Sequence, residues 1–333
     1  MDCWAPEEMN TEISIIIPNW NGKSYLERCL NSLKDQDFSN YEVIVVDNGS
    51  TDGSVEFIEN FFPKARVVAF EENQGFSRAV NEGIRRAKGK YVLLLNNDIE
   101  ADPHLLRHLH EAISSSGDVD FCACRMMDFR TRELIDGIGD GYPRKGKAFR
   151  IGHGAKYEPP FDRRRRVFGA CAGAALYKKT LFEVVGLFDE DFFAYHEDAD
   201  WNFRANLMGY RCHYLPQAVV YHSGSSTTGS LVNEFTVFHN IRNMINVIVK
   251  NMPTALLLKF LPRILWGQAE SFLRYCVLQP YFRSYFAGLF DAMRLSSRMV
   301  KKRKQIQTNR TLSNCQLEHL FIASEGEKKS QTR

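Results

Sequence analysis

Short apolar segments alternate with helical patterns through the first third of the chain, and this alternation constrains the fold more than any other feature. Each segment is continuously hydrophobic and is followed by polar or turn-forming residues, as expected of strands buried on both faces. Between the segments, apolar side chains recur at the period of a helix. Strands and helices that alternate about every 25 residues predict βαβ units and a parallel sheet. The predicted strands are residues 13–17, 43–46, 67–70 and 91–95.

The remaining two thirds divide into an irregular segment followed by regular elements. Residues 125–166 lose all periodicity among glycines and prolines, which predicts loops and hairpins. Before that segment we expect a helix at 102–115 and a strand at 119–124. After it we expect a strand at 169–177, helices from 180 and from 198, two short strands at 211–215 and 218–222, a mobile loop at 224–229, helices from 233 to 304 and a frayed polar tail.

Composition and charge exclude several classes of protein. The 43 basic and 40 acidic side chains leave a net charge of +3, which is too small to indicate a nucleic-acid-binding protein. Eight scattered cysteines match no metal-site or disulfide-framework spacing, which favours a reducing compartment such as the cytoplasm. We expect no secretory signal, because the N-terminus lacks an apolar stretch. We also expect no membrane span, because no uncharged apolar run approaches about 18 residues.

Polar residues stand directly after each of the four predicted strands. In an open parallel sheet, ligands bind beyond the carboxyl ends of the strands, so these positions are the candidate binding site. Turn formation accounts for the Asn-Gly and Asp-Gly pairs, but it does not account for Asp47 and Asp98 at the tips of apolar strands. The four polar segments are residues 18–22, 47–52, 71–75 and 96–98.

Glycine motifs for phosphate binding are missing from the positions where such a fold uses them. The run Gly137-Ile-Gly139-Asp-Gly141 lies far from the first strand-to-helix turn and lacks the third spacing of the dinucleotide motif. No phosphate-loop motif ending in Gly-Lys-Ser or Gly-Lys-Thr occurs in the chain. A nucleotide is therefore expected to be held by carboxylates and a metal ion.

An ordered series of short motifs runs along residues 12–225. The motifs are Ser14-Ile-Ile-Ile-Pro18-Asn-Trp-Asn21, Asp47-Asn-Gly-Ser-Thr-Asp-Gly53, Asn73-Gln-Gly-Phe76, Asn96-Asn-Asp98, Gly173-Ala174, Gly186-Leu-Phe-Asp-Glu190 and His196-Glu-Asp-Ala-Asp-Trp201. Each motif alone is weak, but the ordered set resembles glycosyltransferase family 2. The resemblance implies a GT-A type fold, a nucleotide-diphosphate-sugar donor, a divalent metal ion (Mg²⁺ or Mn²⁺) and inversion at the anomeric carbon.

The expected fold is therefore an α/β fold of GT-A type, with a mostly parallel, Rossmann-like sheet flanked by helices and a C-terminal helical extension. The catalytic domain would span 13–230, with a nucleotide-binding half at 13–98 and an acceptor and catalytic half at 99–230. The other expected parts are an N-terminal extension at 1–12, amphipathic helices at 231–305 and a flexible tail at 306–333.

The resemblance assigns metal binding to Asp98, the last position of the family's Asp-x-Asp motif. Mg²⁺ and Mn²⁺ prefer carboxylate oxygens and keep coordination sites open for phosphates and water. The chain departs from the motif at Asn96, which removes one formal charge and leaves an amide for the ribose or a water molecule. His222, at the end of a predicted strand, is the second candidate metal ligand or a diphosphate contact. The alternative for His222 is a histidine bonded only to the backbone.

Donor binding and base catalysis are assigned by the same resemblance. Asp47 would accept a hydrogen bond from a pyrimidine N3–H or from the ribose. Asp198 would be the general base that takes the acceptor's proton, and its alternative role is to stabilise the first turn of a helix. Trp201 is expected to form a wall under the sugar or acceptor, with core packing as the alternative. The implied donor-binding residues are Pro18, Asn21, Asp47, Asn73, Asn96, Asn97, Asp98 and Trp201.

A basic and aromatic stretch at 283–310 predicts an amphipathic helix. It holds eight Lys and Arg residues against one acid, Asp291. Such a helix can lie on an anionic membrane surface, which suits a polyprenyl-diphosphate-linked acceptor, or it can pack on the catalytic domain with its basic face in solvent. The pair Arg242-Asn243 is also typical of relatives that build bacterial polysaccharides, but the sequence assigns it no chemistry.

The main functional hypothesis is an inverting glycosyltransferase of polysaccharide assembly. Its donor would be a UDP- or dTDP-sugar, with dTDP-rhamnose as one candidate, and its acceptor a saccharide or lipid-linked hydroxyl at the inner face of the cell membrane. One alternative is a sugar-phosphate nucleotidyltransferase, which is disfavoured because residues 18–23 lack a glycine- and arginine-rich loop. The other is a non-catalytic nucleotide-sugar-binding scaffold, for which Asn96 leaves room.

Overall fold

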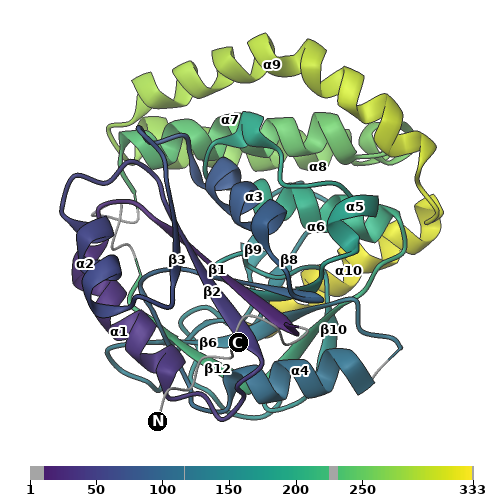
Figure 1. Ribbon diagram of the computed structural model, residues 1–333. Coiled ribbons are helices and arrows are strands. Elements are labelled where there is room, and N and C mark those ends of the chain that lie inside the picture. The colour runs from purple at the N-terminus through teal and green to yellow at the C-terminus, as the bar shows by residue number, and fades with distance from the viewer. Residues whose placement is uncertain (1–10, 116, 225–231, 332–333) are drawn as a thin grey trace.

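A single twisted sheet runs through the centre of the protein and joins the two expected halves of residues 13–230 (Figure 1). The structure is a computed structural model that describes residues 11–115, 117–224 and 232–331. In chain order the strands are β1 (Ile13–Asn19), β2 (Tyr41–Asp47), β3 (Arg66–Ala69), β4 (Tyr91–Leu95), β5 (Ile99–Ala101), β6 (Phe121–Asp128), β7 (Ile135–Gly137), β8 (Asp140–Gly141), β9 (Phe149–Arg150), β10 (Arg165–Val167), β11 (Ala174–Lys178) and β12 (Cys212–His222).

Helices cover the sheet and build a separate layer above its second half. Two short non-α turns, η1 (Glu190–Phe192) and η2 (Leu273–Val277), connect longer elements. The helices are α1 (Lys23–Lys34), α2 (Ser54–Phe61), α3 (Phe76–Arg86), α4 (Leu105–Ser115), α5 (Leu181–Val184), α6 (Glu197–Leu207), α7 (Glu234–Asn251), α8 (Thr254–Phe272), α9 (Phe282–Thr308) and α10 (Asn314–Gln331).

The sheet order is β10-β12-β6-β11-β4-β1-β2-β3, with β5 and β7 pairing at its side. Strands β4, β1, β2 and β3 are mutually parallel, and β11 joins them antiparallel through β4. Side chains alternate between two cores: Ile15 and Ile17 pack with α1 and α4, whereas Ile16 and Leu94 pack on the other face. The four expected strands and the α/β, GT-A type architecture are confirmed.

The register of the parallel strands brings their polar tips together. Asn19 at the end of β1 lies opposite Asp47 at the end of β2. On the other side, β5 pairs antiparallel with β12 so that His222 lies opposite Ile99, the residue after Asp98. The carboxyl edge of the sheet therefore gathers residues from distant parts of the chain.

Residues 211–222 differ from the two short strands expected there. They form one strand, β12, whose pairing with β6 shifts register between Leu215 and Val219. Pro216 lies at the shift, where a residue without a backbone N–H interrupts the ladder least. The break in the apolar pattern between Leu215 and Ala218 therefore corresponds to this register shift and not to a turn between two strands.

The expectation of a flexible tail at 306–333 is wrong for the described residues. Helix α9 continues to Thr308, and α10 follows it. In α10 the side chains of Leu317 and Phe321 are fully buried, and Phe321 packs against Phe203. The apolar residues of α10 are confined to Leu317 and 320–323, a stretch too short for the sequence pattern to reveal a helix. The expected N-terminal extension, up to residue 10, and the loop at 225–229 lie outside the described residues.

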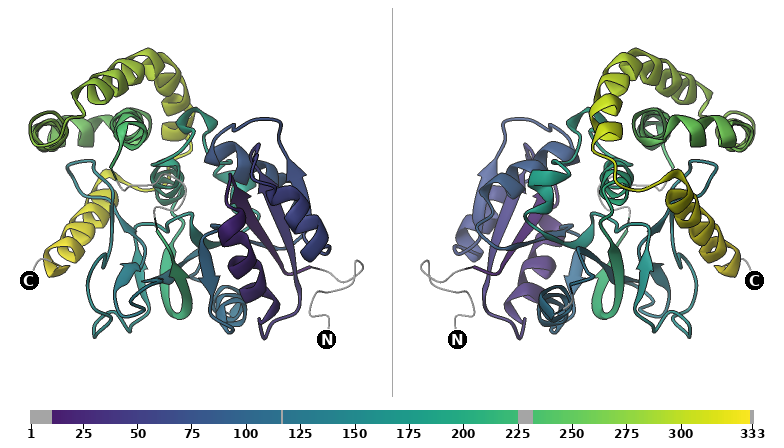
Figure 2. Two further views of the ribbon diagram at one scale, coloured as in Figure 1. Left: turned by 90° about the vertical axis from the view of Figure 1, so that its left-hand side faces the viewer. Right: turned by 90° about the vertical axis from the view of Figure 1, so that its right-hand side faces the viewer.

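Helices α7, α8 and α9 stand over the second half of the sheet, and strand β1 and helix α10 lie on opposite sides of the molecule (Figure 2). An apolar core between these helices includes Val237, Ile241 and Met244 of α7 and Tyr285 and Met299 of α9. None of the described helices combines the length and the hydrophobicity that crossing a bilayer requires.

Candidate active site

Asn19, at the tip of β1, connects two of the predicted donor-binding residues. Its Nδ2 donates to Asp47 Oδ1 at 2.8 Å, and its Oδ1 accepts from Asn97 Nδ2 at 2.7 Å. All three side chains are buried. Gly22 passes so close that a Cβ there would lie 2.0 Å from Asn97 Nδ2, so this position requires glycine. Sequence analysis assigned Asn19 no role, although it stands at the strand end where such a role is expected.

The loops after β1 and β2 hold each other in place beside Asp47. Asp47 Oδ2 accepts from the backbone N–H of Ser50 at 2.9 Å, and Ser50 Oγ accepts from the N–H of Asn21 at 2.8 Å. Asn21 Oδ1 accepts from the N–H of Thr51 at 2.8 Å. Each carboxylate oxygen of Asp47 has a further lone pair for a ligand N–H. Pro18 lies within β1, opposite Val46.

Asn73 organises the loop after β3. Its Oδ1 accepts from Asn48 Nδ2 and from the N–H of Gly75, each at 2.9 Å. Asn48 Oδ1 in turn accepts from the N–H of Gln74. Asn73 therefore ties this loop to the one after β2. Contact of Asn73 with a donor stays a prediction.

His222 lies between two carboxylates. Its Nε2 is 3.4 Å from Asp98 Oδ1, and its Nδ1 is 2.8 Å from Asp136 Oδ2. Burial by itself would lower the pKa of His222, but the hydrogen bonds to Asp136 and Asp98 outweigh it and raise the pKa to about 9. Without a metal ion, His222 is therefore protonated at neutral pH and bridges the two acids. This is not the backbone-bonded histidine that sequence analysis kept as the alternative.

Arg150 extends this arrangement on the far side of Asp136. Its Nη1 donates to Asp136 Oδ2 at 2.6 Å, and its Nη2 lies 3.6 Å from Cys171 Sγ. A Cβ at Gly137 would lie 2.5 Å from Arg150 Cδ, and a Cβ at Gly141 would lie 2.5 Å from the Phe149 ring. The glycine run at 137–141 thus makes room for β9. Asp136 and Arg150 come from the segment without periodicity, so no sequence signal identified them.

Asp198 lies in the first turn of α6. Its Oδ1 accepts from the N–H of Ala199 at 2.7 Å, and its Oδ2 is 3.4 Å from the N–H of Ala172. Burial, together with the charge of Asp198, raises the pKa of Glu197 and of Asp140 well above the ordinary range of carboxyl groups. Burial therefore disfavours the charged form of both of these neighbours of Asp198.

A line of contacts joins the three predicted acids along the carboxyl edge. Asp47 reaches Asn97 through Asn19, and the next residue in the chain is Asp98. From Asp98 the contacts pass through His222, Asp136 and Arg150 to Cys171, whose neighbour Ala172 contacts Asp198. The N–H of Asn96 also donates to the carbonyl of Gly173 at 2.8 Å.

Asn243 and Arg242 hold the turn that precedes Asp198. Asn243 Nδ2 lies 2.7–2.9 Å from the carbonyl oxygens of residues 192, 194 and 195, and Arg242 Nη2 donates to the carbonyl of 192 at 2.6 Å. Within the turn, Tyr195 and His196 have φ angles of 66° and 65°. Left-handed backbone at non-glycine residues costs about 1–2 kcal/mol each, so the side chains of α7 stabilise a strained turn.

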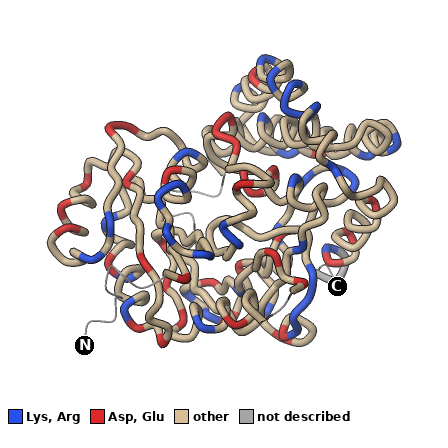
Figure 3. Tube along the Cα trace, turned by 45° about the vertical axis from the view of Figure 1, so that its right-hand side comes forward, with Lys and Arg blue, Asp and Glu red and all other residues tan. Residues whose placement is uncertain are grey.

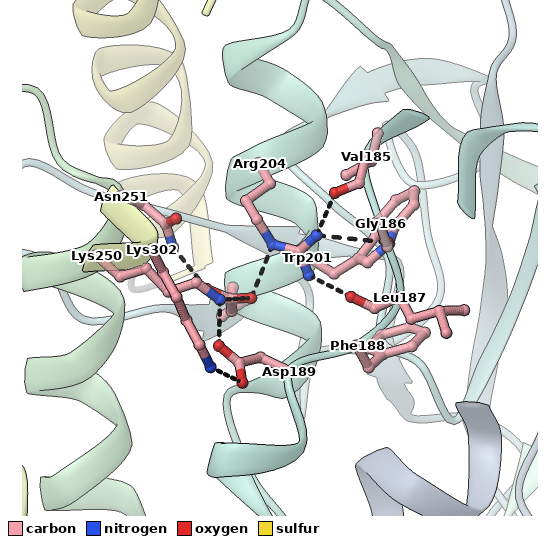
Figure 4. A network of polar contacts seen from close by, with 12 residues as sticks. Val185, Gly186, Leu187, Phe188, Asp189, Trp201, Arg204, Lys250, Asn251 and Lys302 are labelled. Carbon is pink, nitrogen blue, oxygen red and sulfur yellow. Dashed lines mark hydrogen bonds and ion pairs between the residues drawn. The ribbon is translucent and has the colours of Figure 1, made fainter. Parts of the chain in front are cut away.

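A buried polar network behind this turn joins α6, α7 and α9 (Figure 4). Lys250 Nζ contacts Asp189 Oδ2 at 2.6 Å and Asp200 Oδ2 at 2.8 Å. Arg204 Nε donates to the same oxygen of Asp200 at 3.0 Å. Lys302 of α9 also binds Asp189. The acid-rich segment around Asp198 is therefore mostly engaged in structural ion pairs.

Trp201 is not a wall of a binding site. It is fully buried and makes edge contacts with Phe121 and Tyr177 of the sheet. Its Nε1 donates to the carbonyl of Gly186 at 2.9 Å. The side of α6 that carries Trp201 faces β6 and β11, so the alternative of core packing is correct.

Two surface hollows lie away from the line of contacts. One of about 390 Å³ is lined by Arg125, Tyr157 and Tyr221 among others, and one of about 490 Å³ by Arg28, Glu100 and their neighbours. Neither includes Asp47, Asp98 or Asp198. We assign the site from the convergence of polar groups, because a hollow without catalytic groups carries no chemistry.

Asp98 and His222 fit a divalent metal ion as a pair. Within residues 11–115, 117–224 and 232–331, no three His, Cys, Asp or Glu side chains are grouped as metal ligands. Mg²⁺ is commonly held by one or two carboxylates plus substrate phosphates and water. Imidazole binds many transition metals, but Mn²⁺ prefers oxygen ligands to imidazole. A two-residue set at 3.4 Å is compatible with a metal that arrives together with a diphosphate.

Comparisons with known proteins identify chains that are similar to this one. The model of the family described as glycosyl transferase family 2 matches residues 14–186. The putative teichuronic acid biosynthesis glycosyltransferase TuaG of Bacillus subtilis is 36% identical over 89 residues, which are 26% of this chain and 35% of TuaG. The chain spans about a third or less of most of the curated relatives it matches.

Solved structures share the fold at low sequence identity. S. aureus TarS 1-349 in complex with UDP-GlcNAc has a TM-score of 0.59 and 18% identity, and the match covers 96% of this chain and 92% of that one. GalNAc-T7 with UDP, GalNAc and Mn²⁺ has a TM-score of 0.66 and 16% identity, with coverage of 97% and 58%.

Proposed function

Because the chain belongs to glycosyl transferase family 2, we propose that it is a glycosyltransferase that moves a sugar from a nucleotide-diphosphate donor to a hydroxyl group of an acceptor. The observation that carries this proposal is the line of contacts that places Asp47, Asp98 and Asp198 along one edge of the sheet. We assign donor binding to residues 13–98 and the acceptor and base to 99–230.

In the proposed reaction the acceptor oxygen forms a bond to C1 of the sugar while the bond from C1 to the diphosphate oxygen breaks. A single displacement of this kind inverts the anomeric carbon. The acceptor's proton must leave as the bond forms, because a sugar hydroxyl has a pKa far above neutral. Asp198 takes that proton, and the nucleoside diphosphate departs with the electron pair.

The donor is proposed to be a UDP- or dTDP-sugar, with dTDP-rhamnose as one candidate. TarS and GalNAc-T7 were solved with UDP or UDP-GlcNAc, which supports a pyrimidine nucleotide. Asp47 would accept from N3–H of the base or from the ribose, beside Pro18 and Asn21. Asn73, Asn96 and Asn97 would complete the donor site. When bound by Asp98 and His222, a divalent ion supplies positive charge that stabilises the departing diphosphate.

The acceptor is proposed to be a saccharide or a polyprenyl-diphosphate-linked sugar at the inner face of the cell membrane. Helix α9 supports this by its divided surface: Phe286, Phe290 and Met293 are exposed, and Lys and Arg recur along the helix (Figure 3). Further along α9, Arg298 and Lys302 pair with Asp191 instead. Within 283–310, membrane contact is therefore assigned to the first half, while the second half packs on the protein.

Asp198→Asn tests the assignment of the base. The amide cannot take a proton, so turnover is expected to fall about 10²- to 10⁴-fold while donor affinity, measured by calorimetry, stays within twofold. Asp162→Asn, at a half-exposed acid that lies 3.9 Å from Arg163 Nε, is the matched control. Turnover within a factor of three of the parent would remove Asp198 from the chemistry.

A donor panel separates the proposal from its alternatives. With Mg²⁺ or Mn²⁺ present, slow release of a nucleoside diphosphate indicates glycosyl transfer chemistry. Release of pyrophosphate indicates a nucleotidyltransferase, and binding without any product indicates a scaffold. Full activity after exhaustive treatment with EDTA would exclude the metal ion from the proposal.

A further inference from the structure

We propose that Asp136 is a positioning residue that holds His222 with its Nε2 toward Asp98, and that Arg150 fixes Asp136 for this task. The inference rests on the proposed function, because it concerns the residues assigned to the metal ion. It adds two residues from the irregular segment that neither the sequence motifs nor the family comparison assigns.

The contacts form an ordered row of four side chains. Arg150 Nη1 lies 2.6 Å from Asp136 Oδ2, the same oxygen lies 2.8 Å from His222 Nδ1, and His222 Nε2 lies 3.4 Å from Asp98 Oδ1. The side chains of Asp136, His222 and Asp98 are 13%, 11% and 7% exposed, so water competes little for these contacts. The row begins on β9, crosses β7 and β12, and ends beside β5.

The chemistry of imidazole explains why the second nitrogen matters. A histidine ligand almost always donates its other ring N–H to a carboxylate, carbonyl or water, which sets the tautomer and the ring orientation. With the proton on Nδ1 directed to Asp136, the lone pair of Nε2 points toward Asp98. Without Asp136, the ring can rotate or carry its proton on Nε2, and neither state presents the Nε2 lone pair beside Asp98.

Asp136 is itself held from several sides. The guanidinium of Arg150 approaches it over Gly137, where any side chain would collide with Arg150 Cδ. His153 Nδ1 lies 3.0 Å from the backbone carbonyl of Asp136 and 3.5 Å from its Oδ1. Since Oδ2 already faces both Arg150 and His222, the geometry assigns Asp136 to orientation and not to direct coordination.

The test measures Mn²⁺ binding by electron paramagnetic resonance, with Mn²⁺ alone and with Mn²⁺ plus UDP. Nitrogen modulation in the pulsed spectrum reports a directly bound imidazole. We expect His222→Ala to abolish this modulation. We expect Asp136→Asn and Asp136→Ala to weaken Mn²⁺ binding about 10- to 100-fold and to reduce or broaden the modulation. Asp162→Asn removes an acid from the same segment and is expected to leave both readouts unchanged.

The outcomes distinguish failure of the positioning role of Asp136 from failure of the metal site at Asp98 and His222. If Asp98→Asn and His222→Ala lose Mn²⁺ but both Asp136 variants bind it with parental affinity and modulation, the positioning role is wrong and the metal site stands. If the parent shows no nitrogen modulation, His222 is no ligand, and both assignments fail. Should the Asp136 variants prove unfolded by circular dichroism, Arg150→Gln interrupts the same row, and parental Mn²⁺ binding in that variant would overturn the proposal.

Discussion

At the residue scale, single polar side chains connect segments that are distant in the chain. Asn19 links Asp47 to Asn97, and His222 links Asp98 to Asp136. The strand ends in the sequence point to Asp47 and Asp98, because the carboxyl ends of parallel strands lie at one edge of the sheet. The partners of these acids, Asn19 and Asp136, follow from side-chain geometry and were not predicted.

The protonated state of His222 makes stability depend on pH. Its pKa is about 9 in the folded protein and roughly 6.5 in an unfolded chain. A raised pKa stabilises the fold fully below pH 6.5, and the contribution is lost as pH rises through 9. In EDTA, the melting temperature of the parent is therefore expected to approach that of His222→Gln between pH 6.5 and 9.5. A difference between the two proteins that stays constant over this range would contradict the assignment.

At the element scale, α7 acts as a support for the turn that precedes α6. Asn243 Nδ2 contacts three carbonyl oxygens of a turn in which Tyr195 and His196 have left-handed backbone. The pair Arg242-Asn243, which the sequence singled out without a role, thus holds the segment that leads into Asp198.

Asn243→Ala is expected to move Asp198 without removing it. Turnover should fall at least tenfold, because a displacement of about 1 Å can lower the rate about 10²-fold. Donor affinity should change less than twofold, because the residues assigned to the donor lie on other loops. A steady-state comparison of kcat and donor KM checks this. Equal losses in both constants would indicate general unfolding of the site instead of a shifted turn.

Helix α9 presents two different surfaces along its length, and its first half is the part assigned to the membrane. Phe282→Ser together with Phe286→Ser is expected to reduce sedimentation with anionic phosphatidylglycerol vesicles at least fivefold, since interfacial helices bind through buried apolar area and lipid charge. The control is Phe61→Ser, at an exposed phenylalanine on α2. If the double variant and the control bind vesicles alike, α9 does not contact the membrane.

At the scale of the whole molecule, the C-terminal helices pack against the elements that carry the candidate site. Lys250 and Asp200 are buried where α6, α7 and α9 meet, and Lys250 also contacts Asp189 (Figure 4). Helix α10 then returns to the sheet side and inserts Leu317 and Phe321 among aromatic side chains of residues 142, 168 and 203. Helix α10 is thus part of the folded core through Leu317 and Phe321.

Phe321→Ala measures how much α10 contributes. Removing a fully buried phenylalanine is expected to lower the free energy of unfolding by about 3–5 kcal/mol. Ile322→Ala, at the next residue, which is 42% exposed, is expected to change it by less than about 1 kcal/mol. Urea unfolding of the two variants decides the matter, and similar values for both would mean that α10 is loosely attached.

The sequence by itself determined the sheet, the flanking helices and the acids at the strand tips, because hydrophobic period is a local property and parallel strands share one carboxyl edge. Only the tertiary structure decided which partners those acids acquire. Asp136 reaches His222 across 86 positions of chain and is itself held by Arg150, and no local period marks such contacts. The tertiary structure also decided that Trp201 lies in the core and that Leu317 and Phe321 attach α10 to it. Burial depends on which surfaces meet, and that is settled when the whole chain packs.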